Sequence, residues 1–301
     1  MATRRAWLIA FWCRKSSTAN ALTWISPAWT KPWRFFKLAW TCPHSNKPSP
    51  APALTLKLEL PDWPGARLYG STRQGGVSVG DYQSLNLGDH VGDDPAKVTE
   101  NRRRVAKTWG VRPVFMRQVH GTQLVCIDHT TEHETPEADV CWSTKTGLAC
   151  TIMVADCLPV LFYQPQARVV AAAHAGWRGL ASGVLETTLD MLAAFGSVKE
   201  LRVWLGPCIG PSAFEVGQEV RAALCLEDAT ATAWFKQAAQ PGKYLADLAG
   251  IARHRLHQSG VEEIQGNDST PVWCTVTQKD LYFSHRRDRV SGRFAAAIAL
   301  V

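Results

Sequence analysis

Three short segments of the chain place reactive side chains beside glycine or proline at the ends of apolar runs. They are residues 117–121 (RQVHG), 155–159 (ADCLP) and 174–179 (HAGWRG). In α/β proteins reactive groups usually lie where strands lead into loops, because a rigid sheet positions side chains that remain accessible. His120, Cys157 and His174 are therefore candidates for one common site.

Two different chemistries would use these same side chains. Two imidazoles and one thiolate suit zinc, and three protein ligands leave a fourth tetrahedral position open for water or substrate. Alternatively, Cys157 is a metal-free nucleophile, with His174 or His120 as its base and Asp156 orienting the imidazole. The three residues are far apart in sequence, so their spacing does not distinguish between these two chemistries. It also does not exclude unrelated roles for the three residues.

Anion binding is a further candidate function. Gly176 and Gly179 flank Arg178 directly before a predicted helix that begins at Leu180. Free backbone N–H groups at the start of a helix favour phosphate or a developing oxyanion. Arg178 would clamp phosphate with paired hydrogen bonds, and the alternative is that it makes a structural ion pair.

Other polar residues are weaker candidates. Arg73, in the segment 71–76 (STRQGG), and the basic run 102–104 resemble Arg178 in character, although the run also fits a solvated helix face. His90, in the segment 87–92 (LGDHVG), is a reserve candidate for the site.

Apolar patterning predicts the elements that must position these residues. Buried strands are expected at Leu148–Val154, Val160–Tyr163, Val169–Ala173 and Leu201–Leu205. Helices are expected at Leu180–Phe195 and Tyr244–Gln258, where apolar residues recur at helical spacing. Strands that alternate with helices favour an α/β fold, and we expect a single layered α/β domain with a mixed sheet over residues 54–301.

Composition separates an N-terminal extension from this domain. The chain has 301 residues, 46% of them hydrophobic, and a formal net charge of +7. Residues 1–50 contain basic but no acidic side chains and six tryptophans, so the rest of the chain is nearly neutral. We expect residues 1–53 to be a disordered extension or a start site placed too far upstream. Alternatively, residues 1–53 are an export signal, or a segment that binds nucleic acid by stacking its tryptophans on the bases.

The remaining composition points to a cytoplasmic protein. The nine cysteines are scattered and form no CxxC pair, which favours a reducing compartment over a disulfide framework. No apolar run of about 18 residues exists, so a transmembrane helix is not expected. Neither nucleic acid nor a membrane is an expected partner of residues 54–301, and the oligomeric state is not indicated.

Several segments, in order, resemble the YfiH-type family, also called the laccase-domain or polyphenol oxidase family. The resemblance runs from about residue 60 to residue 301. It is carried by residues 71–76, 84–88 (SLNLG), 92–95 (GDDP), 101–102 (NR), 118–121, 155–159, 174–179, 205–207 (LGP), 214–217 (FEVG) and 244–247 (YLAD).

The resemblance implies a zinc-dependent purine nucleoside phosphorylase with His120, Cys157 and His174 as metal ligands. Such an enzyme converts adenosine, inosine, guanosine or methylthioadenosine and phosphate to the free base and a pentose 1-phosphate, with adenosine deamination as an additional activity. The expected catalytic residues are Cys157, His174 and Asp156.

Either Arg178 or Arg73 is expected to orient the phosphate. Asn86 and Gln118, which lie in two of the matching segments, are further candidates for substrate binding.

A copper-dependent polyphenol oxidase is another reading of the same resemblance. A multicopper oxidase fills four copper positions chiefly with histidines and usually contains His-x-His pairs. The chain has nine histidines and no His-x-His pair. Zinc is therefore the expected metal, although copper(II) also binds such ligands tightly.

Overall fold

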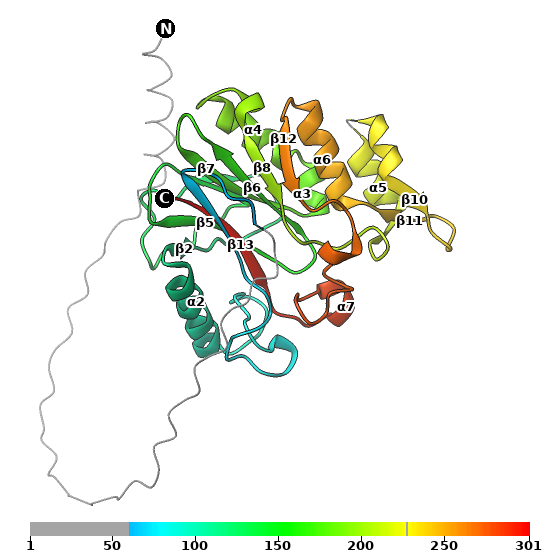
Figure 1. Cartoon of the computed structure of the whole chain (residues 1–301). Coiled ribbons are helices and arrows are strands. Elements are labelled where there is room, and N and C mark those ends of the chain that lie inside the picture. Colours follow the sequence, from blue (N-terminus) through cyan, green and yellow to red (C-terminus); the bar gives the residue numbers. More distant parts are fainter. Residues whose placement is uncertain (1–59, 227) are drawn as a thin grey trace, which may run out of the picture. The chain divides into compact units, whose positions relative to one another are not determined.

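Two β-sheets stacked face to face form the centre of the fold, and helices cover their outer surfaces (Figure 1). The computed structural model describes residues 60–226 and 228–301. The extension expected at residues 1–53 therefore lies outside the described residues. Within the described part the architecture is mixed α/β and layered, as the sequence predicts.

The larger sheet has six strands in the order β12-β8-β6-β7-β4-β3. Every residue of β6 and β7 is buried, as their near-continuous apolar sequences predict. β6 pairs antiparallel with β7 and β8, whereas β12 is parallel to β8 and β3 is parallel to β4. The sheet is therefore mixed, and its strands are β3 Leu124–Cys126, β4 Val140–Ser143, β6 Leu158–Gln164, β7 Val169–Ala175, β8 Arg202–Leu205 and β12 Glu263–Gly266.

The smaller stacked sheet has four strands in the order β1-β13-β5-β2. β13 pairs antiparallel with both β1 and β5, and β2 is parallel to β5. The bounds are β1 Ala66–Gly70, β2 Arg112–Val114, β5 Leu148–Val154 and β13 Phe294–Leu300.

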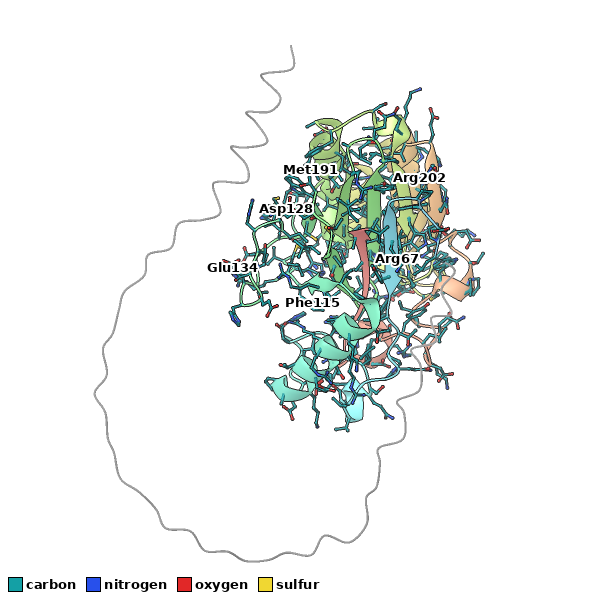
Figure 2. The ribbon with its side chains drawn as sticks, turned by 60° about the vertical axis from the view of Figure 1, so that its left-hand side comes forward. Arg67, Phe115, Asp128, Glu134, Met191 and Arg202 are labelled. Atoms are coloured by element: carbon teal, nitrogen blue, oxygen red, sulfur yellow. The ribbon has the colours of Figure 1, made fainter. Side chains whose placement is uncertain are left out.

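Alternation of side chains along β5 builds two apolar layers. Cys150 and Ile152 belong to the core between the sheets, whereas Ala149 and Met153 pack with Trp109 of α2 (Pro95–Trp109) on the other face. Phe115, just beyond β2, lies near α2 (Figure 2), and the Arg102 guanidinium of that helix stacks on its ring at 4.2 Å. Helix α2 therefore covers the outer face of the four-stranded sheet.

Three helices cover the outer face of the six-stranded sheet, and their apolar sides join one core cluster with β6, β7 and β8. They are α3 (Trp177–Ala181), α4 (Val184–Ala193) and α6 (Leu248–Gln258). A small antiparallel sheet in the order β10-β11-β9 lies beyond α6 (Figure 1). The other elements are β9 Glu215–Gly217, β10 Phe235–Gln237, β11 Lys243–Ala246, α5 Gln218–Cys225, α7 His285–Asp288 and the short 3-10 turns Gly80–Tyr82, Val198–Glu200, Ala229–Trp234 and Pro271–Trp273.

Most of the predicted elements are present, and two helix predictions need correction. β5 has the predicted bounds, and β6, β7 and β8 contain the other predicted strands to within a residue. The predicted helix Leu180–Phe195 is instead two helices, because Gly183 adopts a left-handed φ of 84° between α3 and α4.

The predicted helix Tyr244–Gln258 begins only at Leu248. Residues Lys243–Ala246 form β11, which pairs with β9 and β10, and the Asp247 side chain caps α6 by accepting a hydrogen bond from the Gly250 amide at 2.8 Å. Among the described residues, no helix is long and apolar enough to span a bilayer.

Candidate functional site

The chain crosses from one stacked sheet to the other at residues 155–157. β5 ends at Val154 in the four-stranded sheet, and β6 begins at Leu158 in the six-stranded sheet. Asp156 turns the chain with a φ of 91°. Its carboxylate accepts hydrogen bonds from the Thr275 hydroxyl and the Arg286 amide, both at 2.6 Å. This fixed turn places Cys157 at the seam between the sheets.

His174 lies near the end of β7 and is only 4% exposed. Its Nδ1 is 2.8 Å from the Asp139 carboxylate, and its backbone N–H donates to the Asp139 carbonyl at 2.8 Å. Because Nδ1 is occupied, Nε2 is the nitrogen left to act as a ligand or as a base towards Cys157.

His120 lies in the loop between β2 and β3 and has a left-handed φ of 60°. Its Nε2 is 3.7 Å from the Cys157 Sγ, and its ring centroid is 4.7 Å from that of His174. The ligand atoms of the three residues all lie within 4.8 Å of one another, although the residues come from three separate segments.

Asp139 supports both histidines and is itself completely buried. Besides His174, its carboxylate accepts hydrogen bonds from the amides of Val119, His120 and Gly121 at 3.2, 2.9 and 2.7 Å. Burial favours a raised pKa for Asp139, but the hydrogen bonds and the charge of His174 outweigh it and lower the pKa. The carboxylate is therefore ionised and fixes the loop that carries His120.

These three side chains could hold a metal ion. Two nitrogens and a sulfur are a donor set that zinc accepts, and a carboxylate bonded to the far nitrogen of a ligating histidine is a common outer-shell partner. The backbone at Gly176 closes one side of the group: a Cβ at this position would lie 2.8 Å from the Cys157 Sγ and 3.1 Å from the His120 Cδ2.

The same electrostatics would serve a thiolate nucleophile. Burial favours a raised pKa for Cys157, but the charges of His174 and His120 and their hydrogen bonds lower the pKa to about 6. Burial likewise disfavours a charged His174, but Cys157 and Asp139 raise its pKa to about 9. Without metal, the pair is a thiolate beside an imidazolium at neutral pH.

The three residues open into a pocket of about 460 Å³. Gln118, Asp156 and Arg178, which are candidates from the sequence, line the same pocket, as does the reserve candidate His90. The Gln118 amide is bonded on both sides to the backbone of Met153, at 2.8 and 2.9 Å.

Two of the expected substrate-binding residues lie away from this pocket. Arg73 lines a separate pocket of about 490 Å³, where its guanidinium donates to the carbonyls of Gln83 and Lys279. Asn86 is completely buried, and its Oδ1 accepts hydrogen bonds from the amides of Gly88 and Arg293 at 2.9 and 2.8 Å.

Sequence reasoning missed four charged residues that belong to this site. Asp139 has no short-range signal, because its partners lie 18 to 35 residues away in sequence. Arg286, Arg289 and Arg293 line the pocket. Their signal was present as a basic cluster, residues 285–293 (HRRDRVSGR), in an otherwise nearly neutral region.

Comparisons with known proteins extend over nearly all of the described chain. Residues 67–301 match the family described as multi-copper polyphenol oxidoreductase laccase. A purine nucleoside phosphorylase of Pseudomonas aeruginosa is 48% identical over 243 residues, covering 80% of this chain and 97% of that protein. The purine nucleoside phosphorylase YfiH of Escherichia coli is 46% identical over 250 residues, covering 81% of this chain and 99% of that protein.

Solved structures of similar proteins share the fold. A Neisseria meningitidis protein is 44% identical with a TM-score of 0.73, covering 79% of this chain and 97% of that one. The YlmD protein of Geobacillus stearothermophilus is 32% identical with a TM-score of 0.72, covering 78% of this chain and 92% of that one.

Proposed function

The chain belongs to the YfiH-type, laccase-domain family, and on this premise we propose that it is a zinc-dependent purine nucleoside phosphorylase. The proposed substrates are adenosine, inosine, guanosine or methylthioadenosine together with phosphate. The proposed products are the free base and a pentose 1-phosphate. Adenosine deamination, in which water replaces the C6 amino group and ammonia leaves, is a proposed additional activity, and the cytoplasm is the proposed compartment.

One observation supports this function above the others: a metal-competent group and several arginines line the same pocket. Phosphorolysis needs an anionic nucleophile held beside the sugar and a leaving purine whose developing charge is stabilised. Trp177 and Phe214 also line the pocket, and their rings suit a planar base. The pocket therefore offers a place for each of the two reactants.

The side chains of this pocket divide the work as follows. Of the two arginines expected from the sequence to orient phosphate, Arg178 lines this pocket and Arg73 lines a different one. His120, Cys157 and His174 would hold zinc, which when bound supplies a Lewis acid near the base. Asp139 keeps His174 in the tautomer that presents Nε2. Asp156 lies beside the base, with its carboxylate held by Thr275 and Arg286.

The decisive test is product analysis with a nucleoside panel, with and without phosphate, by mass spectrometry. Release of base that depends on phosphate supports phosphorolysis, whereas ammonia release that does not need phosphate supports deamination. The variants His120→Ala, Cys157→Ala and His174→Ala should each lose zinc and activity. Full phosphorolysis by two of them would overturn the metal hypothesis.

A metal-free cysteine hydrolase is the second candidate, and the lowered pKa of Cys157 favours it. Elemental analysis of protein purified without added metal separates the two. Near-stoichiometric zinc supports the phosphorylase. Absence of metal, together with labelling of Cys157 by a thiol reagent, supports the hydrolase.

A copper-dependent polyphenol oxidase is favoured only by the description of the matching family. Oxygen uptake with a phenolic substrate after copper loading tests it. The absence of any His-x-His pair from the chain argues against the four-copper arrangement.

A further inference from the structure

The pocket beside the three candidate ligands is strongly cationic. Arg178, Arg286, Arg289 and Arg293 all line it. Among residues 60–226 and 228–301, none of these guanidinium groups has a carboxylate within ion-pairing distance. Asp156 is the acidic residue of the lining, and both of its oxygens already accept hydrogen bonds, from Thr275 and the Arg286 amide. The described protein therefore leaves these positive charges for an anion to neutralise.

Two of the arginines are anchored by one nitrogen only. An Arg286 terminal nitrogen donates to the carbonyls of Ala213 and Glu215, at 3.3 and 2.9 Å. An Arg293 terminal nitrogen donates to the carbonyls of Ser291 and Gly292, at 2.9 and 3.0 Å. In the described part of the chain, the Nε and second terminal nitrogen of each have no hydrogen-bond partner. Each side chain is thus fixed but keeps two donors for a ligand, the number that a phosphate accepts from one guanidinium.

Segments far away in the sequence hold the backbone of both arginines. The Asn86 Oδ1 accepts from the Arg293 amide at 2.8 Å, and the Asp156 Oδ2 accepts from the Arg286 amide at 2.6 Å. Gly88 lies so close to the Arg293 stem that an added Cβ would be 2.8 Å from the Arg293 Cγ. The side chains of Asn86 and Asp156 therefore fix the backbone of the two arginines and leave the guanidinium groups free to face the pocket.

We propose that Arg286 and Arg293 form the phosphate subsite of this pocket, where inorganic phosphate is held beside the candidate metal group. Arg289 and Arg178, which are exposed and have no ion pair in the described chain, contribute charge at its mouth. This assignment rests on the proposed phosphorylase function, which it deepens by locating the second substrate. It differs from the sequence-based expectation, which assigned phosphate to Arg178 or Arg73.

The test compares Arg286→Gln and Arg293→Gln with a control that removes the same charge elsewhere. Arg67→Gln is a suitable control, because Arg67 is exposed on β1 (Figure 2) and does not line the pocket. With zinc-loaded protein, we expect the KM for phosphate to rise about 10- to 100-fold in both pocket variants, as for loss of a charge-assisted hydrogen-bonded pair. The KM for inosine should change less than about threefold, and the control should match wild type.

Calorimetric titration with inorganic phosphate alone keeps this proposal separable from the proposed function. If the wild type binds phosphate and the two pocket variants do not, the subsite stands even if no phosphorolysis is detected. If phosphorolysis occurs and both variants keep wild-type phosphate binding and KM, the subsite is overturned while the function stands.

Circular dichroism and Arg286→Lys and Arg293→Lys variants control for misfolding. These conservative variants keep the charge but lose the paired geometry, so partial recovery of phosphate binding is expected. Failure of the wild type to bind phosphate at all, with or without zinc, would also overturn the proposal.

Discussion

Replacement of Asp139 by Asn should weaken both metal binding and the fold. The carboxylate accepts four hydrogen bonds, three from the amides of residues 119–121 and one from His174. An Asn side chain has a single acceptor oxygen and directs an NH₂ group at the remaining donors. It also removes the negative charge that favours His174 as a well-oriented ligand.

The expected magnitudes follow from this count. Charged hydrogen bonds contribute about 1.5–3 kcal/mol each, and Asn keeps some of them, so the free energy of unfolding should fall by about 2–4 kcal/mol. Loss of an outer-shell partner of a metal ligand typically costs about 10- to 100-fold in metal affinity. Zinc affinity is measured by competition with a chromophoric chelator, and stability is measured by urea unfolding of the metal-free protein.

Asp128→Asn provides a matched control. Asp128 accepts hydrogen bonds from the Ser143 hydroxyl and from the amide and hydroxyl of Thr144, and it lies in the loop after β3 (Figure 2). It contacts none of the three candidate ligands, so its replacement should reduce stability without changing zinc affinity. A folded Asp139→Asn protein that binds zinc within threefold of wild type would refute the reasoning, as would an equal loss of zinc affinity in Asp128→Asn.

Two further predictions concern close packing and burial. Gly176→Ala should lower zinc affinity at least about tenfold, because the added Cβ would lie 2.8 Å from the Cys157 Sγ. The overpacking should reduce the free energy of unfolding by only about 1–3 kcal/mol. Zinc affinity equal to that of wild type in the chelator competition would contradict this prediction. Burial raises the pKa of Tyr282 to about 12, so its contribution to stability is full below pH 10, the usual pKa of tyrosine, and is lost as pH rises towards 12. Between these pH values, the urea-derived stability of wild type should therefore fall about 2–3 kcal/mol further than that of Tyr282→Phe, and parallel curves would be the opposite result.

Local apolar pattern was sufficient for the central strands because burial on both faces leaves a strong signal. β5 begins and ends at the predicted residues, and the runs that became β6 and β7 are buried throughout. The signal fails where distant pairing decides the structure. Leu245 fits the helical apolar pattern of the residues after it, but pairing of β11 with β9 and β10 on its two sides makes residues 243–246 a strand.

The candidate site was predictable only in part for the same reason. His120, Cys157 and His174 are identifiable by residue type and by the motifs around them, and the fold brings them together. Asp139 and the arginines of residues 286–293 are positioned by contacts between segments up to 207 residues apart. The periodicity of apolar residues in a single sequence does not predict such long-range contacts. Asn86 shows the converse: its motif is recognisable, but its side chain contacts the backbone of Arg293 and does not line the pocket.

The crossing of the chain between the sheets at residues 155–157 makes the position of the reactive group depend on the packing of one sheet against the other. Cys157 lies in the short turn after a strand of one sheet and directly precedes a strand of the other, whereas His174 belongs to the second sheet alone. Separation of the two sheets would therefore strain the turn at residues 155–157 and displace the Cys157 sulfur, even while β6 and β7 stay paired. Release of a bound ion would thus report sheet separation ahead of the loss of secondary structure.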